Sequence, residues 1–389
     1  MCGINGFIDK TGKKDLKKII QQMNQSISHR GPDDIGIWIN EKLGMGMQRL
    51  SIIDLDSGHQ PMHNPSNKST IVFNGEIYNY LTLRAQLKKI GYEFNTISDT
   101  EVILKLYQEY GTSSFKMLDG MFAFSIFDPI KNKIYCVRDF FGEKPLYYFA
   151  DNQTIGWASE LKSLAILKDQ KPNIDSTALS LYFRLTYIPA PFTIYSGIYK
   201  LEPNHYLEID SENFIIEKHL INQNIKTQKI ETKEQAIRYT HDTVMESVGS
   251  RMVSDVPLAS FLSGGVDSSI ISLCLSQWQS QPIDTFSIGF ENALYDESKN
   301  AEMVAKIIGS KHHNFLCGEK DIFSISEKVI LNFDEPYADS SALCSYWVAH
   351  HTSKSFKVAL TGDGGDEVFG GYNKYLIGKM AHRYHKWIP

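Results

Sequence analysis

Apolar residues in the first half of the chain occur in short runs separated by turn-forming residues. Such runs predict β-strands, and they cover 69–75, 120–128, 133–139 and 144–150. A helical spacing of apolar positions predicts a helix over 15–27. A second helix is predicted over 98–111, where Ser98 and Glu101 have the spacing of a capping box. The pattern predicts a first domain, residues 1–210, of antiparallel strands and a few helices.

The pattern changes after a polar stretch over 211–234, which we interpret as a linker. Apolar strands then alternate with helices; the predicted strands are 256–262, 284–290 and 356–362, and the predicted helices are 233–252, 268–278 and 297–309. This alternation is typical of a parallel α/β sheet, which binds ligands at the carboxyl ends of its strands. The sequence therefore predicts a second domain, of a different class, over 235–389.

Length and composition agree with this division and narrow the class of protein. A chain of 389 residues is long enough for two domains. The net charge of −5 gives no reason to expect nucleic acid or an anionic membrane as a partner. The five cysteines are far apart and form no CxxC pair, which argues against a disulfide framework or a zinc site. Without a secretory leader or a membrane-spanning apolar run, we expect a cytoplasmic protein.

Two glycine-rich turns follow predicted strands of the second domain. They are SGGVDSS, Ser263 to Ser269, and TGDGGDE, Thr361 to Glu367. Glycines let backbone N–H groups approach an anion, and the start of the following helix favours negative charge. Neither turn has the lysine of a P-loop, so a bound triphosphate would need Mg²⁺ held by carboxylates. Each turn alone could also be an ordinary strand–helix connection.

The second residue of the chain is Cys2. Removal of Met1 would leave its thiol and a free α-amine on one residue. A neutral amine can then act as the general base of the thiol, as in enzymes with an N-terminal threonine nucleophile. A frayed terminus without a role is the alternative.

Eight motifs, spread along the whole chain, resemble those of the glutamine-hydrolysing asparagine synthetases and stand in the same order. They are MCGI, RGPDD, QRLSIIDL, NGEIYN, SDTE, RDFFGEKPLYY, SGGVDSS and TGDGGDE. The resemblance implies an N-terminal-nucleophile sandwich of αββα layers, followed by a parallel-sheet α/β domain of the ATP-pyrophosphatase (adenine nucleotide α-hydrolase-like) type.

In the first domain the resemblance implies a glutaminase site with Cys2 as nucleophile. Asn74 and the N–H of Gly75 would form the oxyanion hole. The residues implied to hold glutamine are Arg49, Leu50, Ser51, Ile52, Ile53, Asn74, Gly75, Glu76 and Asp99. From the residues alone, Asn–Gly is also a strong hairpin-turn signal. Asp99 could serve only the helix dipole, and Arg49 could be a surface charge.

In the second domain the resemblance implies a site for ATP and Mg²⁺. The residues implied to contact ATP are Leu262, Ser263, Gly264, Gly265, Asp267, Ser268, Ile288, Thr361 and Gly362. Asp267 and Asp366 match the metal-associated carboxylates. Asp363 lies where many relatives have Glu, beside the acyl-adenylate, and is assigned a catalytic role.

The activity implied is glutamine-dependent asparagine synthesis: ammonia released at Cys2 attacks β-aspartyl-AMP made from aspartate and ATP. The TGDGGDE spelling differs from the SGEGSDE of well-known asparagine synthetases, so another carboxylate, such as a sugar acid, is an alternative acceptor. Family chains continue past this motif. A second alternative is therefore a truncated chain that hydrolyses glutamine but makes little asparagine. The oligomeric state stays open, with a homodimer as one option.

Overall fold

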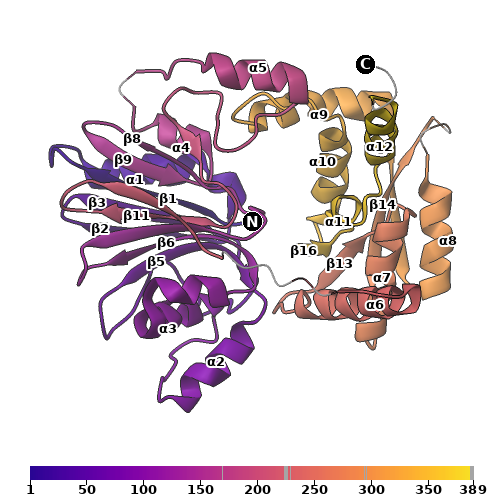
Figure 1. Ribbon diagram of the computed structural model, residues 1–389, viewed down its shortest axis with the longest axis horizontal. Helices are drawn as coiled ribbons and strands as arrows, with labels where there is room; N and C mark the ends of the chain where they lie inside the picture. Colours follow the sequence, from indigo (N-terminus) through magenta and orange to yellow (C-terminus); the bar gives the residue numbers. More distant parts are fainter. Residues whose placement is uncertain (169, 223–226, 228, 293, 295, 386–389) are drawn as a thin grey trace. The chain divides into compact units, whose positions relative to one another are not determined.

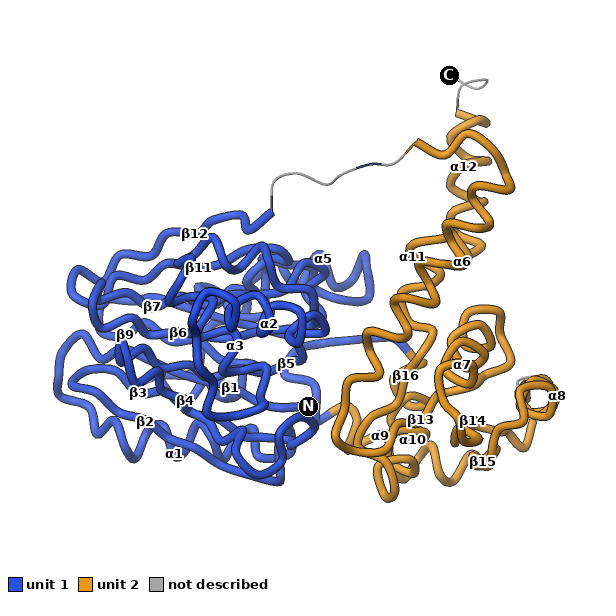
Figure 2. Tube along the Cα trace, turned by 90° about the horizontal axis from the view of Figure 1, so that it is seen from below, with its two compact units in different colours: residues 1–228, 331–339 blue, residues 229–330, 340–389 orange. Residues whose placement is uncertain are grey.

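The computed structural model describes residues 1–168, 170–222, 227, 229–292, 294 and 296–385. The chain forms two compact units, which Figure 2 distinguishes by colour. The first comprises Met1–Gln228 and, unexpectedly, the later segment Leu331–Asp339. The second comprises Lys229–Ile330 and Ser340–Pro389.

The first unit contains two antiparallel sheets. One has the strand order β10 (Tyr199–Lys200), β8 (Tyr147–Ala150), β9 (Thr154–Ala158), β1 (Gly3–Asp9), β3 (Leu43–Arg49) and β2 (Asp34–Asn40). The other has the order β12 (Ile216–Leu220), β11 (His205–Asp210), β7 (Lys133–Arg138), β6 (Gly120–Asp128), β5 (Thr70–Ile77) and β4 (Met62–His63). The predicted antiparallel class of this domain is confirmed.

The two sheets face each other across a core, and helices cover their outer faces (Figure 1). Met45 and Trp157 of the first sheet and Val72 of the second are completely buried in that core. Helices α1 (Leu16–Ser26) and α4 (Leu161–Ala165) pack on the first sheet, and α3 (Asp99–Tyr110) packs on the second beside α2 (Tyr80–Lys89). Helix α5 (Ser176–Leu185) follows later in this unit. The layers are therefore αββα, as the resemblance implied.

Two sequence expectations about this unit need correction. Ser98 caps α3, but its hydroxyl accepts from the N–H of Thr100, and the carboxylate of Glu101 accepts from Asn95 and Thr96 instead of completing a capping box. The polar stretch 211–234 is not a linker throughout, because its apolar Ile216 begins strand β12, which pairs with β11. Part of that stretch lies outside the described residues.

The second unit is built on one parallel sheet, as predicted. Its strand order is β15 (Lys311–Cys317), β14 (Asp284–Phe290), β13 (Leu258–Phe261) and β16 (Val358–Leu360). The helices are α6 (Lys233–Ser250), α7 (Val266–Trp278), α8 (Ser298–Ile308), α9 (Glu319–Asn332), α10 (Ser341–Thr352), α11 (Gly365–Phe369) and α12 (Asn373–His385).

Alternation along the strands places helices on both faces of this sheet. Ser260 of β13 turns to one face, where its hydroxyl lies 2.9 Å from that of Ser272 in α7. Phe286 of β14 turns to the other, where it stacks on Phe315, which in turn stacks on His351 of α10. Neighbouring residues of a strand point to opposite faces, so α7 and α10 cover opposite sides. The strands end together at one edge, where the two glycine-rich turns begin.

No helix in the described part of the chain is long and apolar enough to cross a membrane.

Candidate active sites

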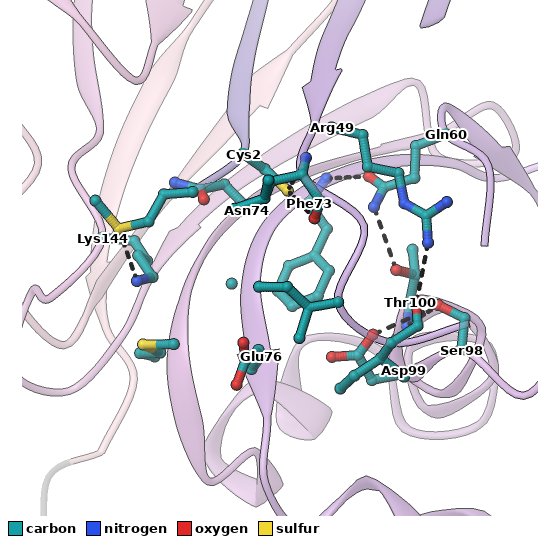
Figure 3. A pocket seen from close by; sticks show the side chains of 16 residues that line it. Cys2, Arg49, Gln60, Phe73, Asn74, Glu76, Ser98, Asp99, Thr100 and Lys144 are labelled. Atoms are coloured by element: carbon teal, nitrogen blue, oxygen red, sulfur yellow. Dashed lines mark hydrogen bonds between the residues drawn. The ribbon is translucent and has the colours of Figure 1, made fainter. Parts of the chain in front are cut away.

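A pocket in the first unit brings most of the predicted glutaminase residues together (Figure 3). The residues that line it are Met1, Cys2, Arg49, Leu50, Ile52, Ile53, Gln60, Phe73, Asn74, Gly75, Glu76, Ser98, Asp99, Thr100, Met121 and Lys144. They come from both sheets and from the start of α3. Ser51 is outside this set, and its N–H donates to Asp33 at 2.8 Å.

Cys2 lies directly before β1, so its backbone is held by the first sheet. Its Sγ accepts from the N–H of Leu50 at 3.4 Å and lies 3.5 Å from the carbonyl oxygen of the same residue. Burial raises the pKa of the thiol, and the contact with Leu50 opposes this only in part. A thiol in this state needs a base before it can act as a nucleophile.

Asn74 and Gly75 lie inside strand β5, so the hairpin-turn interpretation is wrong. Asn74 is 1% exposed, yet its Nδ2 and Oδ1 have no hydrogen-bond partner in the described part of the chain. Buried polar groups are normally paired, so this side chain is available to a ligand. Gly75 has φ +155°, and a Cβ there would lie 2.1 Å from the carbonyl oxygen of Met121. Glycine is therefore required next to the candidate donor.

Arg49 is buried in the wall of the pocket, which excludes the alternative of a surface charge. One guanidinium nitrogen donates to the carbonyl oxygens of Ile53 and Asp54 at 2.9 and 2.7 Å. The second terminal nitrogen, NH1, is buried without a partner among the described residues. An oriented guanidinium with one free nitrogen is suited to a carboxylate.

Two acids of the pocket are protonated more readily than usual. Burial, with a contribution from Asp99, raises the pKa of Glu76 to about 7. Burial also raises the pKa of Asp99 to about 6, although its carboxylate accepts from the N–H of Ile77 at 3.1 Å. Lys144 faces the same space, and burial lowers its pKa. Binding of an ammonium group would favour the ionised acids, which is the behaviour needed for an amino-acid ligand.

Sequence reasoning missed several residues of this pocket, among them Gln60 and Lys144. Lys144 belongs to the RDFFGEKPLYY motif, so the motif was a usable signal although no role was attached to it. Gln60 precedes a proline in a segment without a periodic pattern, and no sequence signal marks it.

In the second unit the two glycine-rich turns lie against each other. After β13, the hydroxyls of Ser263 and Ser268 lie 2.9 Å apart across the first turn, and Gly264 adopts φ +83°. A Cβ at Gly365 of the second turn would lie 2.6 Å from the carboxylate carbon of Asp267. The sheet thus places the two turns that are predicted to bind nucleotide next to each other.

A pocket beside these turns includes three of the predicted ATP-contacting residues, Leu262, Ser263 and Ile288. Its other lining residues were not predicted; they are Phe261, Phe286, Ser287, Phe290, Glu297, Cys344, Ser345 and Val348. The wall is largely apolar and aromatic, which suits a planar base. Thr361 and Gly362 are not part of this wall, and Gly362 lies instead against the backbone of Ser268.

In the described part of the second unit, the carboxylates do not form a complete metal site by themselves. No group of three or more His, Cys, Asp or Glu side chains in the described residues is arranged to hold a metal ion. Asp267 lies at the contact between the two turns, while Asp366 lies in the first turn of α11 and Asp363 is exposed. Mg²⁺ usually takes one or two carboxylates together with substrate phosphates, and this donor set fits that arrangement.

Comparison with known proteins gives a match for each part of the chain. Residues 1–220 match the family described as glutamine amidotransferase domain, and residues 240–389 match the family described as asparagine synthase. A putative asparagine synthetase (glutamine-hydrolyzing) 2 of Methanocaldococcus jannaschii is 40% identical over 400 residues, covering 97% of this chain and 77% of that protein.

Asparagine synthetases (glutamine-hydrolyzing) 1 and 3 of Bacillus subtilis (strain 168) are 39% and 33% identical. Each alignment covers 96% of this chain, which spans 59% and 63% of the length of these relatives.

The αββα sandwich with its amidotransferase match, joined to a parallel-sheet unit, defines a glutamine amidotransferase with a second, synthetase-type domain. Within that class, the chain belongs to the family of glutamine-hydrolysing asparagine synthetases.

Proposed function

We propose that the first unit hydrolyses glutamine and that the ammonia is used to convert aspartate to asparagine with ATP. The observation that carries the glutaminase half is the convergence of Cys2 with two groups that have no partner among the described residues, the Asn74 amide and one nitrogen of Arg49. The synthetase half is supported by the family match over 240–389 and by the two turns that meet at Asp267.

In the glutaminase step, Cys2 attacks the side-chain amide carbon of glutamine after Met1 has been removed. Its freed α-amine takes the thiol proton and delivers it to the departing nitrogen. Ammonia is released, and a glutamyl thioester remains on Cys2. Asn74 and the N–H of Gly75 donate to the oxygen of the tetrahedral intermediate. Water then hydrolyses the thioester to glutamate and regenerates the thiol. Arg49 holds the α-carboxylate of glutamine, and Asp99 with Glu76 holds its α-ammonium.

In the synthetase step, the β-carboxylate of aspartate attacks the α-phosphorus of ATP and pyrophosphate leaves. Ammonia then attacks the acyl carbon, AMP leaves, and a proton is released. Backbone groups of Ser263–Ser269 hold the pyrophosphate portion, and Leu262 with Ile288 packs on adenosine. Bound Mg²⁺ would neutralise phosphate charge beside Asp267 and Asp366. Asp363 is the candidate acid beside the acyl-adenylate.

The test supplies glutamine, aspartate, ATP and magnesium, and measures glutamate, AMP, pyrophosphate and asparagine. Omission of aspartate should remove AMP and asparagine but leave glutamate. Cys2→Ala should abolish glutamate formation and keep synthesis from ammonium. If the protein forms glutamate but makes no asparagine from glutamine or from ammonium, its activity is glutamine hydrolysis alone. AMP formation with a different carboxylic acid would identify a different acceptor.

A further inference from the structure

The N–H of Gly75 lies on the edge of β5 that faces away from β6. Gly75 is paired in register with Phe122. Phe122 turns its own carbonyl oxygen and N–H to Asp139, at 2.9 and 3.1 Å, so it offers neither group to Gly75. In an antiparallel strand, alternate residues direct their backbone groups to the same edge. Phe73, Gly75 and Ile77 therefore direct their N–H groups to the edge that β4 would cover if it were longer.

Strand β4 is too short to cover that edge. It pairs with β5 only at Thr70 and Ile71, so the three N–H groups that follow have no backbone partner from it. Side chains take two of them. Oε1 of Gln60 accepts from the N–H of Phe73 at 2.6 Å, and Oδ2 of Asp99 accepts from the N–H of Ile77 at 3.1 Å. The N–H of Gly75 lies between these two and faces the pocket that Gly75 lines.

Gln60 is itself held firmly. It is 7% exposed, and its Nε2 donates to the hydroxyl of Thr100 in the first turn of α3 at 3.3 Å (Figure 3). The main-chain carbonyl oxygen of Gln60 lies against Gly36 of β2, where a Cβ would be only 1.7 Å from that oxygen. The side chain of Gln60 ties the loop after β3 to the β5 edge and to α3, and its two hydrogen bonds keep its acceptor oxygen in place.

We infer that Gln60 is a positioning residue for the oxyanion hole, which it serves by fixing the β5 edge through the N–H of Phe73 so that the N–H of Gly75 points at the reacting carbonyl oxygen. Gln60 makes no bond to the oxyanion. Its effect is on the direction of the next N–H along the edge, and oxyanion donors act only when they are aligned before the reaction. This inference rests on the proposed glutaminase function.

The test compares Gln60→Met with Gln108→Met, both with Met1 removed. The control is matched because Gln108 lies on α3 in the same unit and accepts a hydrogen bond from Asn64 at 2.7 Å, outside the pocket. Gln60→Met should lower kcat for glutamine hydrolysis by about 10- to 100-fold, the range expected for a misaligned catalytic group, and change KM less than about 3-fold. Gln108→Met should leave both constants near those of the parent.

Hydrogen exchange supplies a second measurement that does not require turnover. The peptide containing Phe73 and Gly75 should exchange faster in Gln60→Met than in Gln108→Met. A raised KM with unchanged kcat would make Gln60 a substrate-binding residue and overturn the inference. An equal loss of rate and of melting temperature in both variants would also overturn it, because the effect would then be general destabilisation.

If Gln60→Met does not fold, Thr100→Val removes the anchor of the Gln60 amide and keeps its bond to Phe73. That variant should lower kcat severalfold with little change in KM, and an unchanged kcat would contradict the inference. If the parent protein, with Met1 removed and Gln60 unchanged, fails to hydrolyse glutamine, the proposed function falls. The exchange of Phe73 then still tests Gln60, since equal exchange in Gln60→Met and Gln108→Met would overturn its positioning role.

Discussion

Arg30 donates a hydrogen bond from Nε to the main-chain carbonyl oxygen of Cys2 at 2.8 Å. The same guanidinium donates from NH1 to Glu160 at 2.9 Å, and Glu160 pairs with Lys162 at 3.0 Å. Lys162 in turn pairs with Asp334 at 3.3 Å. A continuous set of charged contacts therefore joins the backbone of the nucleophile to the segment Leu331–Asp339. This segment packs in the first unit, although α9 and α10 on either side of it belong largely to the second.

Arg30→Met should lower the rate of glutamine hydrolysis by about tenfold, because the carbonyl oxygen of Cys2 loses the donor that orients the nucleophile. Steady-state kinetics checks this. Arg84→Met is the control, since Arg84 also donates to a backbone carbonyl oxygen in the same unit, that of Thr96, outside the pocket. Equal losses in both variants would show that Arg30 has no special relation to Cys2.

Asp334→Asn should loosen the segment Leu331–Asp339. The carboxylate of Asp334 pairs with Lys162 and also accepts from its N–H at 3.1 Å, and both side chains are largely shielded from water. Hydrogen exchange of a peptide from this segment should become faster. Asp151→Asn, which breaks the more exposed pair with Lys168, should leave it unchanged. Equal exchange in parent and Asp334→Asn would mean that the ion pair does not hold the segment.

The segment Leu331–Asp339 also marks the limit of what the sequence could predict. Its acids have partners far away along the chain: Asp334 pairs with Lys162, and Glu335 pairs with Lys200. No local pattern indicates such pairs, since they form only when the fold brings distant segments together. The apolar spacing of α1 and the strand–helix alternation of the second unit, in contrast, are local, and the structure confirms both.

The candidate site likewise depends on contacts between distant parts of the sequence. From Asn74 and Gly75 alone, a turn was the better prediction, because Asn–Gly favours the backbone of a tight hairpin. The register with β6 decides otherwise, and it runs without interruption from Thr70 to Ile77. The motifs of the family supplied many residues of the pocket that local patterns could not. They supplied no role for Gln60, whose contacts depend on three separate elements.

Asn74→Ala should lower kcat for glutamine hydrolysis by about 10²–10³-fold and change KM little, as expected when one oxyanion donor is lost. The amide of Asn74 has no other hydrogen bond to lose in the described part of the chain, so the fold should tolerate the change. If Asn74→Ala raised KM alone, Asn74 would be a binding residue.

Arg49→Met should behave differently and raise KM, because NH1 is placed to bind the carboxylate of glutamine in the ground state.

The stability of the first unit should fall as the pH rises from 5 to 8. Burial raises the pKa of Glu76 from 4.5 to about 7, so its contribution is fully present below pH 4.5 and is lost as the pH rises through 7. A shift of this size corresponds to about 3 kcal/mol. Glu76→Gln should therefore flatten the dependence, whereas Glu217→Gln, at an exposed carboxylate, should not. Denaturant unfolding at pH 5 and at pH 8 measures the free energy of unfolding. The same pH dependence of this free energy in the parent and in Glu76→Gln would contradict the prediction.

Removal of Met1 should be required for glutamine hydrolysis. While Met1 is attached, the nitrogen of Cys2 is a peptide N–H and cannot accept the thiol proton. Met1 also lines the pocket, and Lys144 donates a hydrogen bond to its sulfur at 3.1 Å. Burial lowers the pKa of the Met1 amine to about 6. A general base must be neutral to accept a proton, and burial of an α-amine favours its neutral form.

The measurement compares two proteins released from a cleavable fusion, one beginning at Cys2 and one with a single glycine before Cys2. Intact mass establishes each N-terminus, and equal melting temperatures establish that the fold is the same. The protein that begins at Cys2 should hydrolyse glutamine, and the protein with the added glycine should be slower by at least the 10²–10⁴-fold typical of a lost general base. Full activity with the glycine in place would show that another group accepts the thiol proton, and the α-amine mechanism would be wrong.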